Sequence, residues 1–370
     1  MALNKVRLGD YIEVIKSPCG IPNLTAFDVS GINREKEFFE PSTQVGEDTS
    51  KYQIVPPGCF ACNTMHVGRD RVLPIALNTT KGNKHVSPAY TVFRWIGDEV
   101  LLKEFLFMYL KSPERDRYFW FNCDSSVRDG MSWSAFCDVE ISVPGIEIQR
   151  KYVRVYQSFL NIQQSVNNSL HDLRVFYEGI MDNAKKSCPM IDVKTLVREV
   201  DRRNTQGILR DVSGIDINKR FIKTVADIAK VDLRKYKIVL PGEIAFSGMQ
   251  TGRDECIRIA LNNGDQPVLI SPAYTVFELD KALVVPSYFQ MWFSRSESDR
   301  RGWFISDSSI RANLDLDRFY EIKIPLPSLE SQKNLSSLFD CFEKRRFISD
   351  ELTNLVSNLC SLLVIGANAE

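Results

Sequence analysis

Two groups of side chains have types and spacings that could hold a metal ion. Cys59 and Cys62 form a CxxC pair, and His66 and His85 follow it. A structural zinc site needs four ligands at a recognisable spacing, and the sequence has no second CxxC. Nine cysteines are also an odd number for a disulfide framework. We therefore interpret the cysteines as thiols, several of them on buried strands, and predict no metal site.

The second group is a nuclease-like fragment. Glu321 and Lys323 lie in "EIK", with Asp315 and Asp317 upstream. A metal-dependent nuclease would place two acids and a lysine around one cation. The alternation in "YEIKIPLP" instead predicts that Glu321 and Lys323 are on the outward face of a strand.

Other catalytic signatures are also missing. The sequence has no Gly-rich loop ending in Lys-Ser/Thr for ATP, and no Asn/Asp-Pro-Pro-aromatic tetrapeptide typical of base-flipping amino-methyltransferases. We predict that the chain is not an enzyme and binds no cofactor of its own.

A loop that occurs twice indicates nucleic-acid recognition. "CNTMHVGRDR" at 62–71 and "SGMQTGRDEC" at 247–256 share a methionine and Gly-Arg-Asp. At two positions the copies differ: His in the first copy corresponds to Gln in the second, and Arg corresponds to Glu. Arg and Gln donate to guanine and adenine edges, whereas Glu accepts from cytosine. The alternative is that Arg and Asp form only a local ion pair. The candidate DNA-binding residues here are Thr64, Met65, His66, Arg69, Arg71, Met249, Gln250, Thr251 and Arg253.

A second loop is duplicated as well. "DSSVRDGMSW" at 124–133 matches "DSSIRANLDL" at 307–316. Small hydroxyls beside an arginine suit phosphate contacts, and a hydrogen-bonded turn is the alternative. The candidate residues are Ser125, Ser126, Arg128, Trp133, Ser308, Ser309, Arg311 and Asn313. A third segment, "NTTKGNKHV", is basic only in the first copy, so Lys81 and Lys84 are expected on a DNA-facing edge or at a solvated hairpin tip.

These loops belong to a repeat that occupies nearly the whole chain. "SPAYTVF" occurs at 87–93 and again at 271–277, and the other matches keep a similar spacing of about 184 residues, which is far too long for a solenoid. The sequence therefore contains a domain duplication. The three histidines have no counterparts in the second copy, which excludes a duplicated histidine-based site.

The repeat unit is expected to be mixed α and β. "YQIVPPG", "VLPIAL" and "AYTVF" are bounded by Gly and Pro and read as strands. In "SPAYTVF" the Ser-Pro sets a turn, after which Tyr90 and Val92 face one side while Thr91 and Phe93 face the other. "LLKEFLFMYLKS" and "PSYFQMWFSRS" read as matched helices.

Each unit ends in a long helix. Phe159, Ile162, Val166, Leu170 and Leu173 form one apolar stripe, and Ile348, Leu352, Leu355, Leu359 and Leu362 have the spacing of a coiled-coil seam. We predict that the two helices pack antiparallel on each other. A helix of about 34 residues would span about 50 Å.

Positive and negative side chains balance at 47 each, so bulk charge does not indicate a nucleic-acid partner. No charged-then-apolar signal or membrane-length apolar run is present, and we expect a cytoplasmic protein. Two similar units joined by helices approximate a two-fold dimer in one chain, which suits duplex DNA with two half-sites.

The chain resembles the DNA-specificity subunit of Type I restriction–modification enzymes. The twin "SPAYTVF" strands, "IVPPG" and "IVLPG", and the helix-leading "VPGIEIQ" and "IPLPSLESQ" carry the resemblance. The family usually has Glu-Gln at the start of each helix, and here only Gln149 and Gln332 are kept. The resemblance implies target recognition domains at 1–144 and 187–327, each followed by a spacer helix, at 145–186 and 328–370, with pseudo-two-fold symmetry.

It also implies partners. Each recognition domain would read half of a bipartite DNA target, the helices would set the gap, and two methyltransferase (modification) subunits would dock, with restriction subunits joining that core. S-adenosylmethionine and ATP would be bound by those partners. Aromatic residues of the helices are candidates for docking, with internal packing as the alternative: Tyr152, Tyr156, Phe176, Tyr177, Phe342 and Phe347. The other function considered is a DNA-binding regulator or anti-restriction protein that acts without partners.

Overall fold

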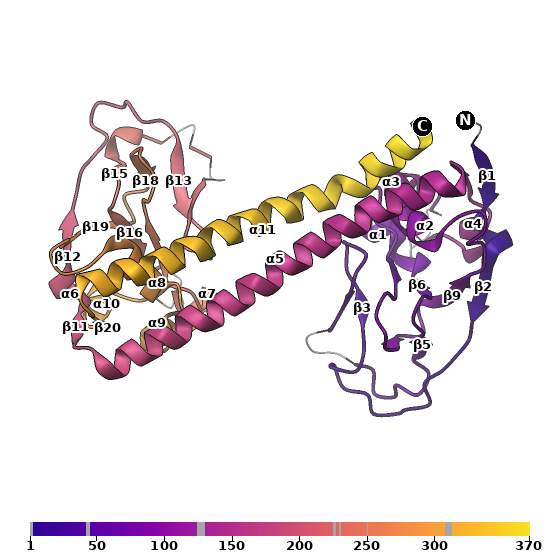
Figure 1. Ribbon diagram of the computed structural model, residues 1–370, viewed down its shortest axis with the longest axis horizontal. Coiled ribbons are helices and arrows are strands. Elements are labelled where there is room, and N and C mark those ends of the chain that lie inside the picture. The colour runs from indigo at the N-terminus through magenta and orange to yellow at the C-terminus, as the bar shows by residue number, and fades with distance from the viewer. Residues whose placement is uncertain are drawn as a thin grey trace. The chain divides into compact units, whose positions relative to one another are not determined.

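The computed structural model describes residues 3–41, 45–123, 130–224, 227–228, 231–249, 251–307 and 313–370, apart from the side chains of His66, Arg69 and Ser357. The chain divides into two compact units. Unit 1 comprises Met1–Ser165 with Ser349–Glu370, and unit 2 comprises Val166–Ile348. Each unit therefore contains a lobe made from one repeat and a segment from each of the two longest helices, α5 and α11 (Figure 1).

The lobe of unit 1 is followed by helix α5. Its elements are β1 (Asn4–Arg7), η1 (Leu8–Tyr11), β2 (Ile12–Ile15), β3 (Gly31–Ile32), β4 (Phe38–Phe39), β5 (Gln53–Val55), β6 (Phe60–Cys62), η2 (Thr64–His66), α1 (Val67–Asp70), β7 (Ile75–Leu77), β8 (Lys84–Val86), β9 (Thr91–Trp95), α2 (Lys103–Leu110), α3 (Pro113–Phe121), α4 (Trp133–Cys137), β10 (Glu140–Val143) and α5 (Ile146–Ser187).

The lobe of unit 2 repeats this order of strands, with α6 in the place of η1 and with η3 before β15, and is followed by α11. Its elements are β11 (Met190–Asp192), α6 (Val193–Leu196), β12 (Val197–Val200), β13 (Val212–Ile215), β14 (Phe221–Lys223), η3 (Leu233–Lys235), β15 (Lys237–Val239), β16 (Ile244–Ser247), α7 (Thr251–Asp254), β17 (Arg258–Leu261), β18 (Val268–Ile270), β19 (Thr275–Leu279), α8 (Pro286–Phe293), α9 (Ser296–Ile305), α10 (Leu316–Tyr320), β20 (Lys323–Pro325) and α11 (Leu329–Ala369).

The duplicated "SPAYTVF" supplies an inner strand of a four-stranded antiparallel sheet in each unit. The strand orders are β2-β9-β6-β7 and β12-β19-β16-β17. Phe93 pairs with Phe60, and Phe277 pairs with Ile244, so the register is the same in both units. Phe93 packs in one apolar cluster of unit 1 and Val92 in another, which confirms the predicted alternation of faces.

The predicted Ser-Pro turns are present. The backbone N–H of Tyr90 donates to the carbonyl of Ser87 at 3.1 Å, and the N–H of Tyr274 donates to the carbonyl of Ser271 at 3.1 Å. The matched helices are also confirmed, as α2 and α8.

The two glutamines near the start of the long helices have equivalent places in the two units. The Gln149 side chain accepts from the N–H of Leu102 at 3.0 Å and donates to the carbonyls of Val100 and Pro144 at 2.9 and 2.8 Å. Gln332 makes the same three bonds, to Val285, Leu283 and Pro327. Both side chains are buried, so each amide fastens a helix start to the loop before α2 or α8.

Within each unit the segments of α5 and α11 contact each other with opposite chain directions. In unit 1, Lys151 binds Glu370, and Gln163 donates to Thr353 at 3.0 Å. In unit 2 the ring of Tyr177 lies 5.7 Å from that of Phe339, and the Arg174 guanidinium lies 5.7 Å from the centre of the Phe342 ring, so the later residue of α5 contacts the earlier residue of α11.

The predicted apolar seams are partly wrong. Ile162, Ile348, Leu355 and Leu362 are exposed. In α11 the inward positions are instead Ser349, Cys360, Val364 and Ala367, which are smaller than leucine. The leucines form a second stripe on the same helix, and spacing alone did not distinguish the two.

The residues of the nuclease-like fragment lie in and beside helix α10 and strand β20. Asp315 caps α10 by accepting from the N–H of Arg318 at 2.8 Å, and Glu321 follows this helix instead of lying in a strand. Lys323 is exposed on β20, as predicted. Within the described ranges no three His, Cys, Asp or Glu side chains are grouped so that they could hold a metal ion. Cys59 and Cys62 are buried, and burial raises the pKa of the Cys62 thiol.

No single helix among the described residues is long and apolar enough to cross a membrane. The stretches Leu329–Val356 and Asn358–Ala369 satisfy that test by length and composition only when taken together, and they are bent by 46°.

Candidate nucleic-acid interface

The two duplicated loops meet in each unit. In unit 1 the N–H of Met131 donates to the carbonyl of Thr64 at 2.9 Å. In unit 2 the N–H of Leu314 donates to the carbonyl of Gly248 at 2.9 Å. A Cβ added to Gly248 would lie 1.7 Å from the Leu314 carbonyl oxygen, so this approach requires glycine. The loops of residues 62–71 and 247–256 thus lie against the segments that follow the two "DSS" motifs.

The first loop begins with a cap and ends in a left-handed residue. The side chain of Asn63 accepts from the N–H of Met65 at 3.0 Å. Arg71 has a φ of 54°, and Glu255 at the same place in unit 2 has a φ of 51°. The guanidinium of Arg71 lies 4.7 Å from the centre of the Trp120 ring. The position of Arg71 and Glu255, one of those that differ between the loops, therefore has the same backbone conformation in both units.

Arg253 forms a local ion pair, which was the alternative considered for this motif. Its Nε lies 3.0 Å from Asp254, which also contacts Arg258 at 2.8 Å. The hydrogen bond from Arg258, followed by that from Arg253, lowers the pKa of the Asp254 carboxyl. Arg253 is itself exposed, so the ion pair leaves its guanidinium open to solvent.

Three other predicted residues have defined places. Met65 and Met249 are exposed. Thr251 is buried, and its hydroxyl donates to the carbonyl of Gly248 at 3.0 Å, so the prediction that it contacts DNA is wrong. A hydroxyl that closes the first turn of α7 is unavailable to a ligand.

Two residues of the second loop are involved in local structure. The ring of Trp133 is half-buried and stacks on Phe136 with centroids 5.1 Å apart. The backbone N–H of Asn313 donates to Asp307 at 3.0 Å, which fits the alternative of a hydrogen-bonded turn. Lys81 is exposed in the loop between β7 and β8, which belong to different sheets, and Lys84 is half-buried on β8.

The remaining candidate DNA-binding residues lie outside the part of the chain that the structure describes. They are Ser125, Ser126, Arg128, Gln250, Ser308, Ser309 and Arg311, together with the side chains of His66 and Arg69.

A duplicated buried ion pair supports the loops, and it was not predicted. Lys36 binds Asp116 at 2.7 Å and also donates to the carbonyl of Leu110. The same Asp116 oxygen accepts from the N–H of Leu73 at 2.9 Å, just after the first loop. In unit 2, Lys219 pairs with Asp299, which accepts from the N–H of Ile257. Both lysines have a positive φ, of 63° and 61°.

The predicted docking aromatics divide into two groups. Tyr156, Tyr177 and Phe342 are buried, and Tyr152 is half-buried. The docking prediction is therefore wrong for the three buried rings, which fill the contact between helices. Phe176 and Phe347 are exposed.

Exposed apolar residues recur along both helices at seven residues or twice that spacing. On α5 they include Val155, Ile162 and Phe176, and on α11 they include Ile348, Leu355 and Leu362. Together with Phe347 we call these the outer stripes. A seven-residue spacing of apolar side chains on an exposed helix face is typical of a helix that packs on another helix.

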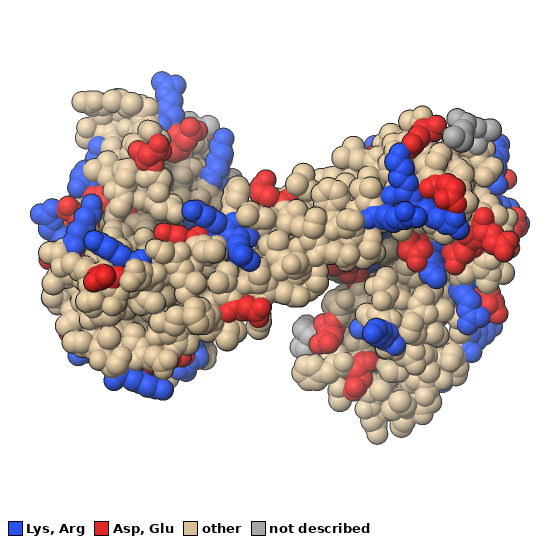
Figure 2. Space-filling view, in the orientation of Figure 1, with Lys and Arg blue, Asp and Glu red and all other residues tan. Residues whose placement is uncertain are grey.

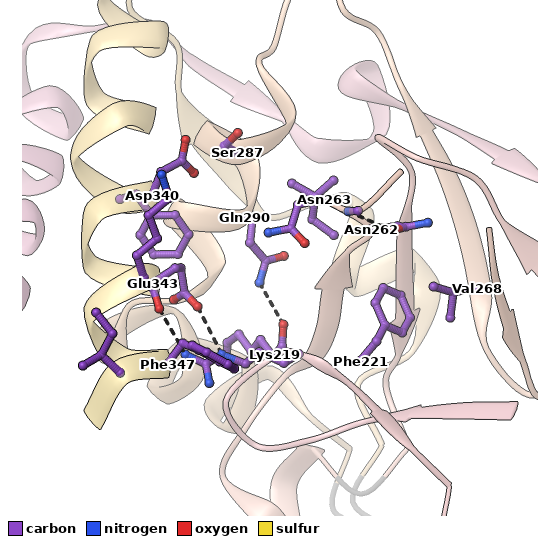
Figure 3. Close-up of a pocket in the computed structure, with 16 residues that line it drawn as sticks. Lys219, Phe221, Asn262, Asn263, Val268, Ser287, Gln290, Asp340, Glu343 and Phe347 are labelled. Atoms are coloured by element: carbon purple, nitrogen blue, oxygen red, sulfur yellow. Dashed lines mark hydrogen bonds and ion pairs between the residues drawn. The ribbon is translucent and has the colours of Figure 1, made fainter. Parts of the chain in front are cut away.

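Phe347 also lines a cavity of about 730 Å³ in unit 2 (Figure 3). Glu343 of α11 binds Arg220 across it at 3.2 Å. The buried Gln290 donates to the Lys219 carbonyl at 3.4 Å, and among the described residues its Oε1 has no hydrogen-bond partner. The corresponding residue of unit 1 is Phe107, whose ring lies 6.1 Å from that of Phe60. Gln290 is thus a lining residue that unit 1 does not share, whereas Lys219 matches Lys36.

Charge is mixed on each lobe. On the face shown in Figure 2, basic and acidic side chains of each unit are interspersed. This agrees with the equal numbers of positive and negative side chains.

The fold has a counterpart of known structure. The crystal structure of a Type I restriction-modification system S subunit from M. genitalium matches 98% of this chain and 96% of that chain, with a TM-score of 0.61 and 15% sequence identity. The chain has the fold of a Type I S subunit. In this S-subunit fold, the loops of residues 62–71 and 247–256 occupy equivalent places in the two units.

Two other solved structures overlap more loosely. A chain from a study of type I R-M system assembly and conformational transition has a TM-score of 0.44 at 13% identity, over 98% of this chain and 97% of that one. The HsdS subunit from Thermoanaerobacter tengcongensis has a TM-score of 0.34 at 12% identity, over 100% and 95%. No protein-family model and no curated protein sequence matches the chain.

Proposed function

We propose that this protein is the DNA-recognition subunit of a Type I restriction–modification complex and catalyses no reaction itself. The observation that carries the proposal is the duplicated loop on an S-subunit fold. Each lobe presents Gly-Arg-Asp on the same backbone frame, while the flanking residues differ, as Arg71 and Glu255 do. Such a pair of sites suits a bipartite DNA sequence whose two halves are different.

The two lobes would act as target recognition domains at 1–144 and 187–327. Helices α5 and α11 would serve as the spacer that sets the length of the unread gap, packed as an antiparallel coiled coil with pseudo-two-fold symmetry. The opposite chain directions of the helix segments within each unit support this arrangement.

The outer stripes favour a function with partners over a regulator that acts alone. Exposed Leu355, Leu362 and Phe176 carry an energetic cost in water that a docked helix would remove. We propose that two methyltransferase subunits bind there and supply S-adenosylmethionine chemistry, and that restriction subunits with ATP join them. Those subunits would also supply positive charge that the balanced composition of this chain lacks.

The test is a map of methylated adenines in the host genome, with and without this gene. Loss of one bipartite motif on deletion is the expected result. Replacing residues 60–72 with those of a relative should then change one half of that motif and leave the other half intact.

The decisive control is co-purification with the neighbouring methyltransferase. A chain that stays alone and binds one DNA sequence tightly would contradict the proposal and favour the regulator.

A further inference from the structure

Three pairs of exposed apolar residues are identical in the two repeats. Among the described residues, large apolar side chains that are both exposed and identical at matching positions are Met65 and Met249, Trp120 and Trp303, and Phe121 and Phe304. Identical residues such as Phe93 and Phe277 are buried and hold the core. Burial cannot account for the three exposed pairs, so a shared surface role is the physical explanation.

The aromatic pairs lie on α3 and α9. Phe121 is 86% exposed and Phe304 is 77% exposed. Arg117 precedes Trp120 and Phe121 by three and four residues, which puts the three side chains on one helix face. Arg300, Trp303 and Phe304 have the same spacing on α9, and all three are exposed. We call these two sets the Arg-Trp-Phe faces.

Each Arg-Trp-Phe face adjoins the Gly-Arg-Asp loop of its own unit. Helix α1 packs on α3, and α7 packs on α9 (Figure 1). Arg71, the residue after α1, covers the Trp120 ring at 4.7 Å. The aromatic residues therefore border the candidate DNA interface.

The chemistry of the faces suits a nucleic acid. Arg117 and Arg300 each pair with a glutamate three residues earlier, at 3.7 and 2.7 Å. Such exposed pairs contribute little to stability, so the arginines are available to phosphate. Arginines bind phosphate and exposed apolar rings beside them can pack on the sugars, contacts that carry no sequence information.

We propose that the Arg-Trp-Phe faces of α3 and α9 are a second DNA-contact element, which binds the sugar–phosphate backbone in the same way at both half-sites. The identity of the faces carries this assignment, because the flanking loops differ where sequence would be read. The inference rests on the proposed function and extends it to helices outside the loops. The outer stripes supply a separate surface for protein partners.

The test uses the assembled complex with methyltransferase and two labelled duplexes, one carrying the mapped methylation motif and one scrambled. We expect Phe121→Ala and Phe304→Ala each to weaken binding to both duplexes by a similar factor, about tenfold for the lost apolar burial of one phenyl ring. Arg117→Ala should reduce the slope of log affinity against log salt by about one unit. The methylated motif should not change.

Phe27→Ala is the matched control, because Phe27 is 83% exposed but its counterpart in the second repeat is Arg210. It should leave affinity unchanged. Unaltered binding by both test variants, an equal loss with the control, or a loss for the motif duplex alone would overturn the inference. Release of the methyltransferase from a variant in the absence of DNA would also overturn it and assign the faces to a protein partner. A wild-type complex that binds neither duplex would instead contradict the proposed function.

Discussion

Replacing Lys36 with methionine should destabilise unit 1 strongly. The Lys36 side chain is 2% exposed, and its ammonium binds Asp116 at 2.7 Å and the carbonyl of Leu110. Burial lowers the pKa of Lys36, while the Asp116 carboxylate opposes that shift. Methionine has a similar length and, like lysine, a Cβ, so the left-handed backbone at φ 63° gains no new strain.

The expected loss follows from what remains after the substitution. Asp116 would become an unpaired carboxylate at 13% exposure, while still accepting from the N–H of Leu73. Breaking a buried ion pair from one side costs about 3–5 kcal/mol, and the retained hydrogen bond places this case near 3 kcal/mol. In unit 2, Asp299 is 22% exposed, so Lys219→Met should cost less.

The assay is urea unfolding of the full chain, together with amide hydrogen exchange at Leu73. Lys36→Met should lower the free energy of unfolding and speed exchange at Leu73. Adding Asp116→Asn should restore much of the loss, because the amide oxygen keeps the Leu73 bond without a buried charge. The exposed Lys51 provides the control, and Lys51→Met should change stability by less than about 0.5 kcal/mol. A Lys36→Met protein as stable as this control would refute the reasoning.

Two other substitutions test neighbouring parts of the structure. Gln149→Ala should cost about 3 kcal/mol in urea unfolding, because it leaves the N–H of Leu102 and two buried carbonyls unpaired; Gln157→Ala, at an exposed site of the same helix, should be neutral. Arg253→Ala should leave stability within about 0.5 kcal/mol and weaken DNA binding by the assembled complex, since Asp254 keeps Arg258. Because the folded-state pKa of Asp254 is lowered from 3.8, its stabilising contribution is complete above that value and is lost as the pH falls through the folded pKa. Asp254→Asn should therefore reduce stability at pH 7, and the reduction should shrink as the pH falls below 3.8; a reduction that does not change with pH would contradict the ion pair.

Much of the fold was predictable because it depends on local patterns. The Ser-Pro turn, the alternation of Val92 and Phe93, and the two long helices each follow from backbone preferences and periodicity. The duplication strengthened each prediction, since the same pattern had to hold twice.

What failed depends on contacts between distant segments. Periodicity could not tell which of two stripes on α11 faces inward, because Leu355 and Cys360 each belong to a helical repeat. The burial of Thr251 follows from packing against α9, where Gly302 lies close to it. One signal was available: Lys36 and Asp116 recur as Lys219 and Asp299 with the spacing of the other repeats, so alignment of the two halves would have identified the pair.

The division of the chain has a consequence for its synthesis. Unit 2 is one continuous stretch, whereas the core of unit 1 includes Cys360, Val364 and Ala367 near the C-terminal end of α11. On the ribosome, unit 1 therefore stays incomplete until residues 360–367 of α11 are translated. Unit 2 has all of its residues before then, so the unit begun earliest is the one finished latest.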